Sequence, residues 1–224
     1  MLSQGTDVQV NSPSLARDVQ PIVFVVDDDI SVRESLESLI ENAGWRPETF
    51  ASGEEFLRHK PIRRASCLLL DYTLPDLNGL QIQQRIAAER PDMSIIFITG
   101  RGDVPITVKA MKAGAVEFLT KPIKSEALIG AIEIAIVRSH AALRRADDVR
   151  EFEACYASLS AREREVMDLV VRGLLNKQVG HKLGISEITV KAHRGRVMKK
   201  MKANTLARLV TLAADFQSSG APIR

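Results

Sequence analysis

The stretch Val23-Phe24-Val25-Val26-Asp27-Asp28-Asp29 ends an apolar run with three consecutive acids. Adjacent carboxylates repel one another unless a cation lies among them, so we expect a divalent-metal pocket at the end of a strand. The run Leu68-Leu69-Leu70-Asp71 repeats this design further along the chain. Two more apolar runs end on a polar side chain, Thr99 in one case and Lys121 in the other.

The polar side chains at the ends of these runs would lie close together if the runs form one parallel sheet. In an open parallel sheet the ligand binds outside the carboxyl ends of the strands. The pattern therefore predicts a site for phosphate plus metal at one sheet edge, formed by Asp27, Asp28, Asp71, Thr99 and Lys121.

The remainder of residues 21–143 supports such a sheet. From Ile22 onward, short apolar runs alternate with amphipathic stretches, which predicts an α/β domain of five parallel strands and five helices. Ser31 with Glu34 and Ser52 with Glu55 fit the capping-box pattern of a helix start. Asp29 is a second candidate cap for the first of these helices.

Composition describes a globular chain. The 224 residues are 45% hydrophobic, and no stretch approaches the about 18 uninterrupted apolar residues of a membrane span. The first residues lack the pattern of a signal peptide, so we expect a cytoplasmic protein with no membrane partner. The two cysteines have no metal-type spacing, and we expect reduced, structural thiols. Residues 1–20 are polar and predict a flexible tail.

Acidic and basic residues are distributed unequally along the chain. Residues 1–145 carry 17 Lys and Arg against 19 Asp and Glu, while residues 146–224 carry 14 against 9. Most of the C-terminal excess falls within residues 187–202, where Glu187 is the single acid. This is the pattern expected of a nucleic-acid contact, although a solvated basic helix has the same composition.

Residues 144–158 join the two halves. They contain no Gly or Pro, and Val149, Phe152, Tyr156 and Leu159 repeat at helical spacing. The pattern predicts a helical linker. So short a repeat leaves two interpretations open, a helix that contributes to dimerisation and a solvated helix that separates two domains.

Residues 159–224 show only helical patterns. Ser160 with Glu163 forms another capping box, and the turn Gly184-Ile185-Ser186 joins a short helix to the basic helix of residues 187–202. A short helix, a tight turn and a basic helix predict a helix-turn-helix unit. We expect Asn204 to cap a last helix that ends near Ala214.

Asp71 is the candidate phosphoacceptor. A strand-end carboxylate beside a divalent cation can attack a phosphoryl donor and form an acyl phosphate. Mg²⁺ suits hard oxygen ligands, with Asp28 and Asp71 as direct ligands and Asp27 acting through water. Lys121 would pair with one phosphate oxygen, and the Thr99 hydroxyl would donate to another.

The chain resembles the two-component response regulators of the NarL/FixJ type over about residues 21–215. The N-terminal part of the resemblance rests on Val26-Asp27-Asp28-Asp29, Asp71-Tyr72-Thr73-Leu74-Pro75-Asp76-Leu77-Asn78-Gly79, Ile98-Thr99-Gly100-Arg101-Gly102-Asp103-Val104, Met111-Lys112-Ala113-Gly114-Ala115 and Lys121-Pro122.

The resemblance implies a flavodoxin-like receiver with strand order 2-1-3-4-5, a Thr73 carbonyl on Mg²⁺ and a cis Lys121–Pro122 peptide bond. It also implies that the Thr99 hydroxyl moves toward phosphate while an aromatic side chain turns inward. Phe118 holds the aromatic position and has no hydroxyl, so this switch would depend on packing.

The C-terminal half resembles the LuxR-type four-helix DNA-binding domain. The matching stretches are Leu159-Ser160-Ala161-Arg162-Glu163-Arg164-Glu165-Val166, Gly173-Leu174-Leu175-Asn176-Lys177-Gln178-Val179 and Ile185-Ser186-Glu187-Ile188-Thr189-Val190-Lys191-Ala192-His193. On this basis Lys191 and Arg194 are expected at base edges and Thr189, His193, Lys199 and Lys200 on phosphates. Gly180, where the family usually has Ala, and Gly195 depart from the pattern.

The resemblance implies a regulator rather than an enzyme. A sensor histidine kinase would phosphorylate Asp71, the protein would dimerise, and the dimer would bind promoter DNA and activate transcription, with RNA polymerase as a further candidate partner. The alternative is a constitutive DNA-binding protein whose receiver is a protein-interaction module. A magnesium-dependent phosphatase is disfavoured, because Thr73 stands where a second acid would be needed.

Overall fold

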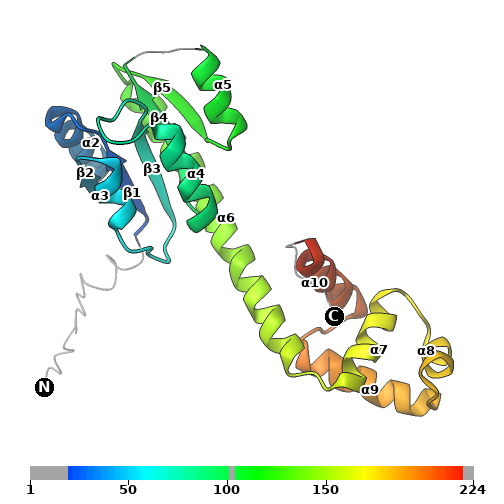
Figure 1. Cartoon of the computed structure of the whole chain (residues 1–224). Helices are drawn as coiled ribbons and strands as arrows, with labels where there is room; N and C mark the ends of the chain where they lie inside the picture. Colours follow the sequence, from blue (N-terminus) through cyan, green and yellow to red (C-terminus); the bar gives the residue numbers. More distant parts are fainter. Residues whose placement is uncertain (1–19, 101–103, 219–224) are drawn as a thin grey trace, which may run out of the picture. The chain divides into compact units, whose positions relative to one another are not determined.

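The computed structural model describes residues 20–100 and 104–218 (Figure 1). The predicted tail, apart from Gln20, and the motif residues Arg101, Gly102 and Asp103 lie outside these ranges. The chain forms two compact units that divide between Leu143 and Arg144. Within the described ranges, none of the helices is long and apolar enough to cross a membrane.

The first unit alternates strands and helices, as the sequence pattern predicts. Its strands form one parallel sheet in the order β2-β1-β3-β4-β5, which confirms the predicted fold class. The elements are β1 (Ile22–Val26), α2 (Ile30–Asn42), β2 (Arg46–Phe50), α3 (Gly53–Arg58), β3 (Ser66–Asp71), α4 (Gly79–Glu89), β4 (Ser94–Thr99), α5 (Val104–Lys112), β5 (Glu117–Thr120) and α6 (Ser125–Ala157).

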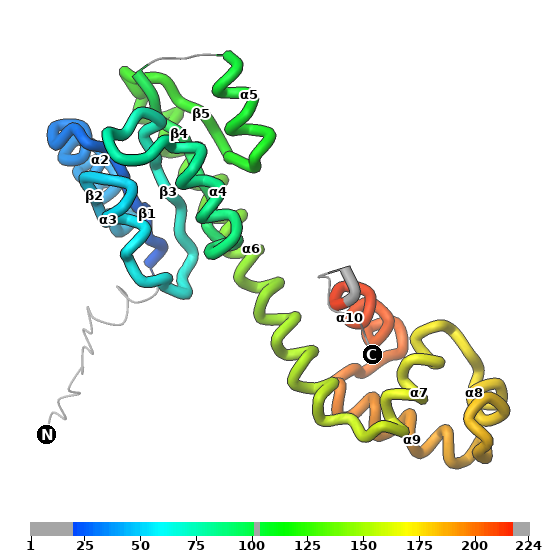
Figure 2. The backbone as a smooth tube through the Cα atoms, in the orientation of Figure 1, coloured from blue at the N-terminus to red at the C-terminus, as the bar shows by residue number. Residues whose placement is uncertain are grey.

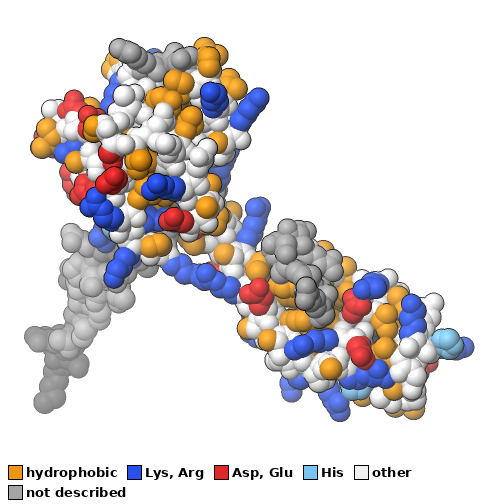
Figure 3. Space-filling view, in the orientation of Figure 1, with side chains coloured by type: hydrophobic (Ala, Val, Ile, Leu, Met, Phe, Trp, Pro, Cys, Tyr) orange, Lys and Arg blue, Asp and Glu red, His pale blue; other side chains and the backbone are white. Residues whose placement is uncertain are grey.

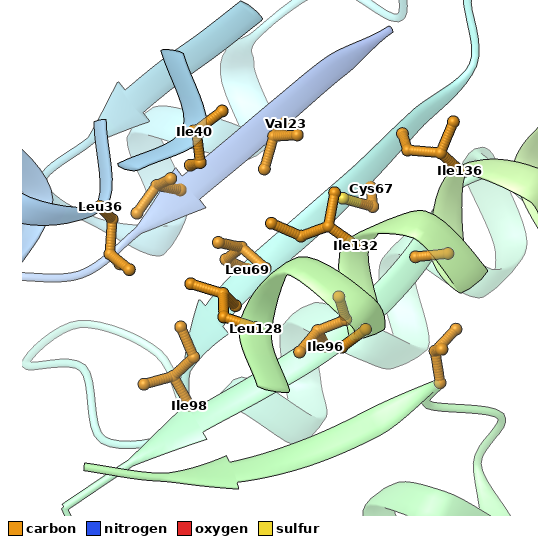
Figure 4. Packing of buried hydrophobic residues seen from close by; sticks show 14 of the residues in the cluster. Val23, Leu36, Ile40, Cys67, Leu69, Ile96, Ile98, Leu128, Ile132 and Ile136 are labelled. Carbon is orange, nitrogen blue, oxygen red and sulfur yellow. The ribbon is translucent and has the colours of Figure 1, made fainter. Parts of the chain in front are cut away.

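The three central strands, β1, β3 and β4, are buried on both faces of the sheet. Successive side chains of a strand point to opposite faces, so Val23 and Leu69 belong to one hydrophobic cluster and Phe24 and Leu70 to the other. Figure 4 shows the first cluster, in which apolar side chains of α2 and of the first turns of α6 lie over the strands. This packing holds the carboxyl ends of β1, β3 and β4 in a constant register, which positions the predicted site.

Helix starts in the first unit are fixed by local caps. Asp29 is the N-cap of α2 and accepts a hydrogen bond from the Ser31 backbone N–H, so the prediction for Asp29 is confirmed and the capping box at Ser31 is wrong. The Asp29 carboxylate, two residues before Ser31, accepts from an unpaired N–H at the helix start, so Ser31 already lies inside the helix. Ser52 caps α3 as predicted.

The second unit is helical. Its elements are the C-terminal part of α6, α7 (Ala161–Val171), α8 (Asn176–Leu183), α9 (Glu187–Lys200) and α10 (Leu206–Ser218), which Figure 2 traces in yellow to red. Gly184 adopts the left-handed conformation at φ 65° between α8 and α9, and Ser186 caps α9. The helix-turn-helix arrangement predicted from the sequence is present.

Two details of this unit differ from or extend the predictions. The last helix is capped by Thr205, whose hydroxyl accepts from the Arg208 N–H, so the prediction for Asn204 is wrong. The predicted linker is helical and is the end of α6. Phe152 on this segment is 4% exposed and stacks on Phe216 of α10, with ring centroids 4.6 Å apart. The segment therefore belongs to the core of the second unit.

Candidate functional site

An acidic cluster lies at the carboxyl ends of the strands. Asp27 directly follows β1 and Asp71 is the last residue of β3, and each of their carboxylates offers an oxygen within 4.8 Å of the others and of Asp28. Asp27 and Asp71 are buried, while Asp28 is exposed. The structure thus brings together the three acids that the sequence pattern singles out.

Lys121 directly follows β5 and balances this charge. Its Nζ atom lies 2.6 Å from Oδ2 of Asp27 and 2.7 Å from Oδ2 of Asp71. Burial alone would lower the pKa of Lys121, but its hydrogen bonds to the two carboxylates hold that pKa above the ordinary value. Burial raises the pKa of Asp27, an effect that the hydrogen bond from Lys121 partly offsets.

Backbone groups fix the two buried carboxylates. The Asp71 Oδ1 atom accepts from the Thr73 N–H at 2.9 Å, and the Asp27 Oδ1 atom accepts from the Asp29 N–H at 3.0 Å. Each carboxylate therefore has one oxygen oriented by the backbone and the other by Lys121. Because both oxygens are held, the orientation of each carboxylate is defined before any ligand arrives.

Sequence reasoning missed Arg33. Its guanidinium, on the first turn of α2, donates to the backbone carbonyls of Asp27 at 2.7 Å and Asp28 at 3.0 Å. These bonds tie the loop that carries the acids to the helix that follows it. A basic residue on the first turn of a helix directly after three acids was the available signal.

The donor set fits Mg²⁺. The acids supply hard oxygen atoms, one of the carboxylates is exposed enough to leave positions for water, and Mg²⁺ in proteins is commonly held by one or two carboxylates with several waters.

Thr99 and Phe118 lie beside this cluster on β4 and β5. Thr99 is buried, and its backbone carbonyl accepts from the Lys121 N–H at 2.7 Å. Phe118 is half-buried, with its ring centroid 6.0 Å from that of Phe97. The Lys121–Pro122 peptide bond is cis, as the resemblance implied. The ends of β4 and β5 are therefore joined by a backbone hydrogen bond between Thr99 and Lys121.

The basic helix of the sequence analysis is α9. Val190 and Val197 on one side of it are buried against the rest of the second unit, while Thr189, Lys191 and Lys199 are exposed. Lys and Arg side chains stand along this part of the unit in Figure 3. The outer side of α9 is therefore accessible and cationic.

Two of the residues expected to contact DNA, Arg194 and Lys200, have partners on other helices of the unit. Arg194 is half-buried and donates to Oδ1 of Asn176, at 3.2 Å. His193 is also half-buried. Lys200 lies 2.7 Å from Oε2 of Glu163, a carboxylate that is 5% exposed. Sequence reasoning found Glu163 as a capping residue and missed its ion pair, because the partner is 37 positions away.

Comparison with known proteins agrees with this geometry. The response regulator receiver domain family matches residues 23–133, and the luxR family of bacterial regulatory proteins matches residues 157–213. The response regulator protein TmoT of Ectopseudomonas mendocina is 41% identical over 90% of this chain and 92% of its own length. Nodulation protein W of Bradyrhizobium diazoefficiens is 46% identical over 86% of this chain and 85% of its own.

Solved structures of response regulators are also similar to this chain. The response regulator StyR is 43% identical, matches 87% of this chain and 98% of its own, and superposes with a TM-score of 0.76. Full-length FixJ from B. japonicum is 38% identical over 88% and 97% of the two chains, with a TM-score of 0.53. The fold and the acidic site define a two-component response regulator with a LuxR-type DNA-binding domain, and the chain belongs to the NarL/FixJ family of these regulators.

Proposed function

We propose that this protein is switched by phosphorylation of Asp71 and that the switched form dimerises and binds promoter DNA. The observation that carries the proposal is the position of Asp71, which is 7% exposed at a strand end, contacts the Lys121 ammonium and clusters with two further acids. The ammonium, and a divalent cation held by the acids, would offset the charge of the incoming phosphoryl group as the carboxylate attacks it.

The transfer itself makes one bond and breaks one. An Asp71 carboxylate oxygen forms a P–O bond to the phosphoryl group as the P–N bond to the histidine of the sensor kinase breaks, and the electron pair returns to the imidazole. Asp28, Asp71 and the Thr73 carbonyl would hold Mg²⁺, with Asp27 acting through water. When bound, the metal supplies charge neutralisation on the phosphoryl oxygens.

Two groups then respond to the new phosphate. Lys121 exchanges its contact with Asp71 for a contact with a phosphate oxygen, and the Thr99 hydroxyl donates to another. Because the Thr99 carbonyl and the Lys121 N–H are bonded to each other, movement at either is transmitted to β5 and to Phe118. Phe118 turns inward against the neighbouring apolar cluster, a change of packing rather than of hydrogen bonding.

An apolar surface on α5 supports dimerisation as the output. Val104, Val108 and Met111 are 73%, 45% and 41% exposed and recur at spacings of four and three, which places them on one side of the helix. Orange side chains gather over α5 in Figure 3. Exposed apolar patches on small domains commonly mark interaction surfaces.

Dimerisation would strengthen DNA binding without new contacts. One helix-turn-helix unit neutralises few phosphates, whereas joining two makes the second contact intramolecular. Within each unit, α9 would enter the major groove, with Lys191 and Arg194 at base edges and Thr189, His193, Lys199 and Lys200 on phosphates. The bound dimer would activate transcription through contact with RNA polymerase.

We also propose functional boundaries for these parts. Residues 21–143 form the receiver, residues 144–158 the helical linker and residues 159–224 the DNA-binding domain. The packing of Phe152 in the second unit supports a linker that is rigidly attached to the DNA-binding domain.

Sedimentation velocity tests the proposal. We expect a shift from monomer to dimer when the wild-type protein receives beryllofluoride with Mg²⁺, and no shift for Asp71→Asn, which keeps the shape of the side chain and removes the charge. An identical response of both proteins, or no shift in the presence of unchanged DNA binding, would contradict the switch and favour a constitutive DNA-binding protein.

A further inference from the structure

Ile188 is an exposed apolar residue on the helix proposed to enter DNA. It lies on the first turn of α9 and is 80% exposed, the highest value among the large hydrophobic side chains in the described part of the chain. A side chain so exposed contributes little to the core of its own unit. Ile188 is therefore expected to contact a molecule that binds the outer side of α9.

Ile188 belongs to a row of uncharged positions on the outer side of α9. With 3.6 residues per turn, Ala192 and Gly195 follow it on the same side, opposite the buried Val190 and Val197. Both Ala192 and Gly195 are exposed, and a Cβ atom added at Gly195 would meet nothing within 4 Å. This row, Ile188, Ala192 and Gly195, is the apolar row of α9.

The surroundings of the apolar row are cationic. Lys191 and Arg196 flank it, Lys199 continues it toward the helix end, and all three are exposed. Glu187 is the single acid of α9, and its Oε1 atom lies 3.5 Å from the Lys191 ammonium. A purely apolar partner would leave these charges without compensation, whereas a polyanion with an apolar group on its surface matches both features.

Thymine in double-stranded DNA has this combination. Its C5 methyl group is the apolar group that distinguishes an A·T pair in the major groove, and residues at the N-terminus of a recognition helix contact base edges. We propose that Ile188 reads the C5 methyl of a thymine, and that the small side chains at 192 and 195 let α9 approach the bases closely. The inference deepens the proposed function and rests on it.

Removal of that one methyl group tests the inference. A double-stranded site would be selected from a random pool with the full-length protein in Mg²⁺ and beryllofluoride. Uracil would then replace each thymine of the site in turn, and the dissociation constants of wild type and Ile188→Ala would be measured by fluorescence anisotropy. Uracil keeps every hydrogen-bonding group of thymine and lacks only the methyl.

We expect one symmetric thymine position at which uracil weakens wild-type binding about fourfold per half-site, which corresponds to about 0.8 kcal/mol for one buried methyl group. Ile188→Ala should bind the thymine and uracil versions of that position equally. Ile62→Ala is the matched control, since Ile62 is a 38% exposed isoleucine of the receiver unit, and it should keep the wild-type response.

Each other outcome counts against the inference. A selected site that contains no thymine, or uracil effects that are the same in wild type and in Ile188→Ala, would overturn it while leaving the DNA-binding function intact. A pool that yields no preferred site would overturn the proposed function and this inference with it. Because Ile188 is 80% exposed, its replacement should not disturb folding, which circular dichroism would verify.

Discussion

The ammonium of Lys121 lies 2.7 Å from Oδ2 of Asp71, and the same atom lies 2.6 Å from Oδ2 of Asp27. One cation, which follows β5 and lies 50 residues after Asp71 in the sequence, thus holds two neighbouring acids together. Lys121 is therefore the counter-ion of both buried acids in this structure.

Replacement of Lys121 by methionine should therefore destabilise the receiver. We expect a loss of about 3 kcal/mol in unfolding free energy in EDTA, because removing one partner of a buried ion pair leaves the others uncompensated. Added Mg²⁺ should restore more stability to this variant than to wild type, because the metal replaces the missing charge. Urea unfolding in EDTA and in Mg²⁺ measures the loss of unfolding free energy and its recovery. Lys124→Met, at an exposed lysine nearby, should behave as wild type.

Stability of the second unit should depend on pH through Glu163. The hydrogen bond from Lys200 lowers the pKa of Glu163 from 4.5 to about 2, with a further contribution from the Ser160 backbone N–H. Because the folded-state pKa is lower than the ordinary value, the stabilisation is complete above about pH 4.5 and is lost as the pH falls toward 2.

Glu163→Gln should lose about 1 kcal/mol at pH 7, because it removes a charge-assisted hydrogen bond whose lysine partner can turn to solvent. The difference from wild type should shrink at pH 3, as urea unfolding at the two pH values would show. Glu165→Gln is the control, because that carboxylate is 51% exposed and its pair with Arg162 is at the surface. A difference that is the same at pH 7 and pH 3 would rule out the ion pair as its source.

The two helical glycines of the helix-turn-helix should respond oppositely to alanine. At Gly195 an added Cβ meets nothing within 4 Å, so Gly195→Ala should raise the unfolding free energy by about 0.5 to 1 kcal/mol. At Gly180 the Cβ would lie 2.7 Å from the carbonyl oxygen of Ile185, whose N–H is bonded to the Gly180 carbonyl.

Gly180→Ala should therefore lower the unfolding free energy by about 1 kcal/mol, since overpacking against a fixed backbone atom outweighs the gain in helix propensity. Thermal unfolding of the two variants beside wild type measures the contrast. Equal stabilisation by both substitutions would contradict this prediction and would mean that the turn at Ile185 shifts to accept a side chain.

The linker segment should be required for stability of the DNA-binding unit. Phe152 is 4% exposed and stacks on Phe216, so Phe152→Ala should cost about 3 to 5 kcal/mol. Ile134→Ala, on a 53% exposed side chain of the same helix, should change stability by less than about 0.5 kcal/mol. Urea unfolding followed by circular dichroism of each full-length variant tests the pair.

A truncation series tests the same contact independently. A fragment of residues 144–224 should unfold cooperatively, while a fragment of residues 159–224 should be markedly less stable, because it exposes the apolar side chains that Phe152 covers. Equal stability of the two fragments would show that the second unit begins after the linker and would remove Phe152 from its core.

Patterns within single segments determined the fold class. The apolar runs that end in Asp27 and Asp71 can be recognised in the sequence, and so can a helix start with a local cap such as Ser160. Hydrophobic periodicity and helix capping each involve only a few neighbouring residues. Parallel connectivity then places the strand ends at one edge, so the acidic cluster follows from topology alone. The resemblance to response regulators added the strand order and the cis peptide bond before Pro122.

The partners of individual side chains were decided only in three dimensions. The contacts of Arg194 with Asn176 and of Lys200 with Glu163 could not be read from the sequence. Exposed basic residues look alike in a pattern, and the packing of one helix on another selects which of them turn inward. Sequence therefore determined the kind of protein and the acidic edge of its sheet. Helix packing decided which side chains of α9 stay exposed, because that choice depends on distances between segments that local periodicity does not encode.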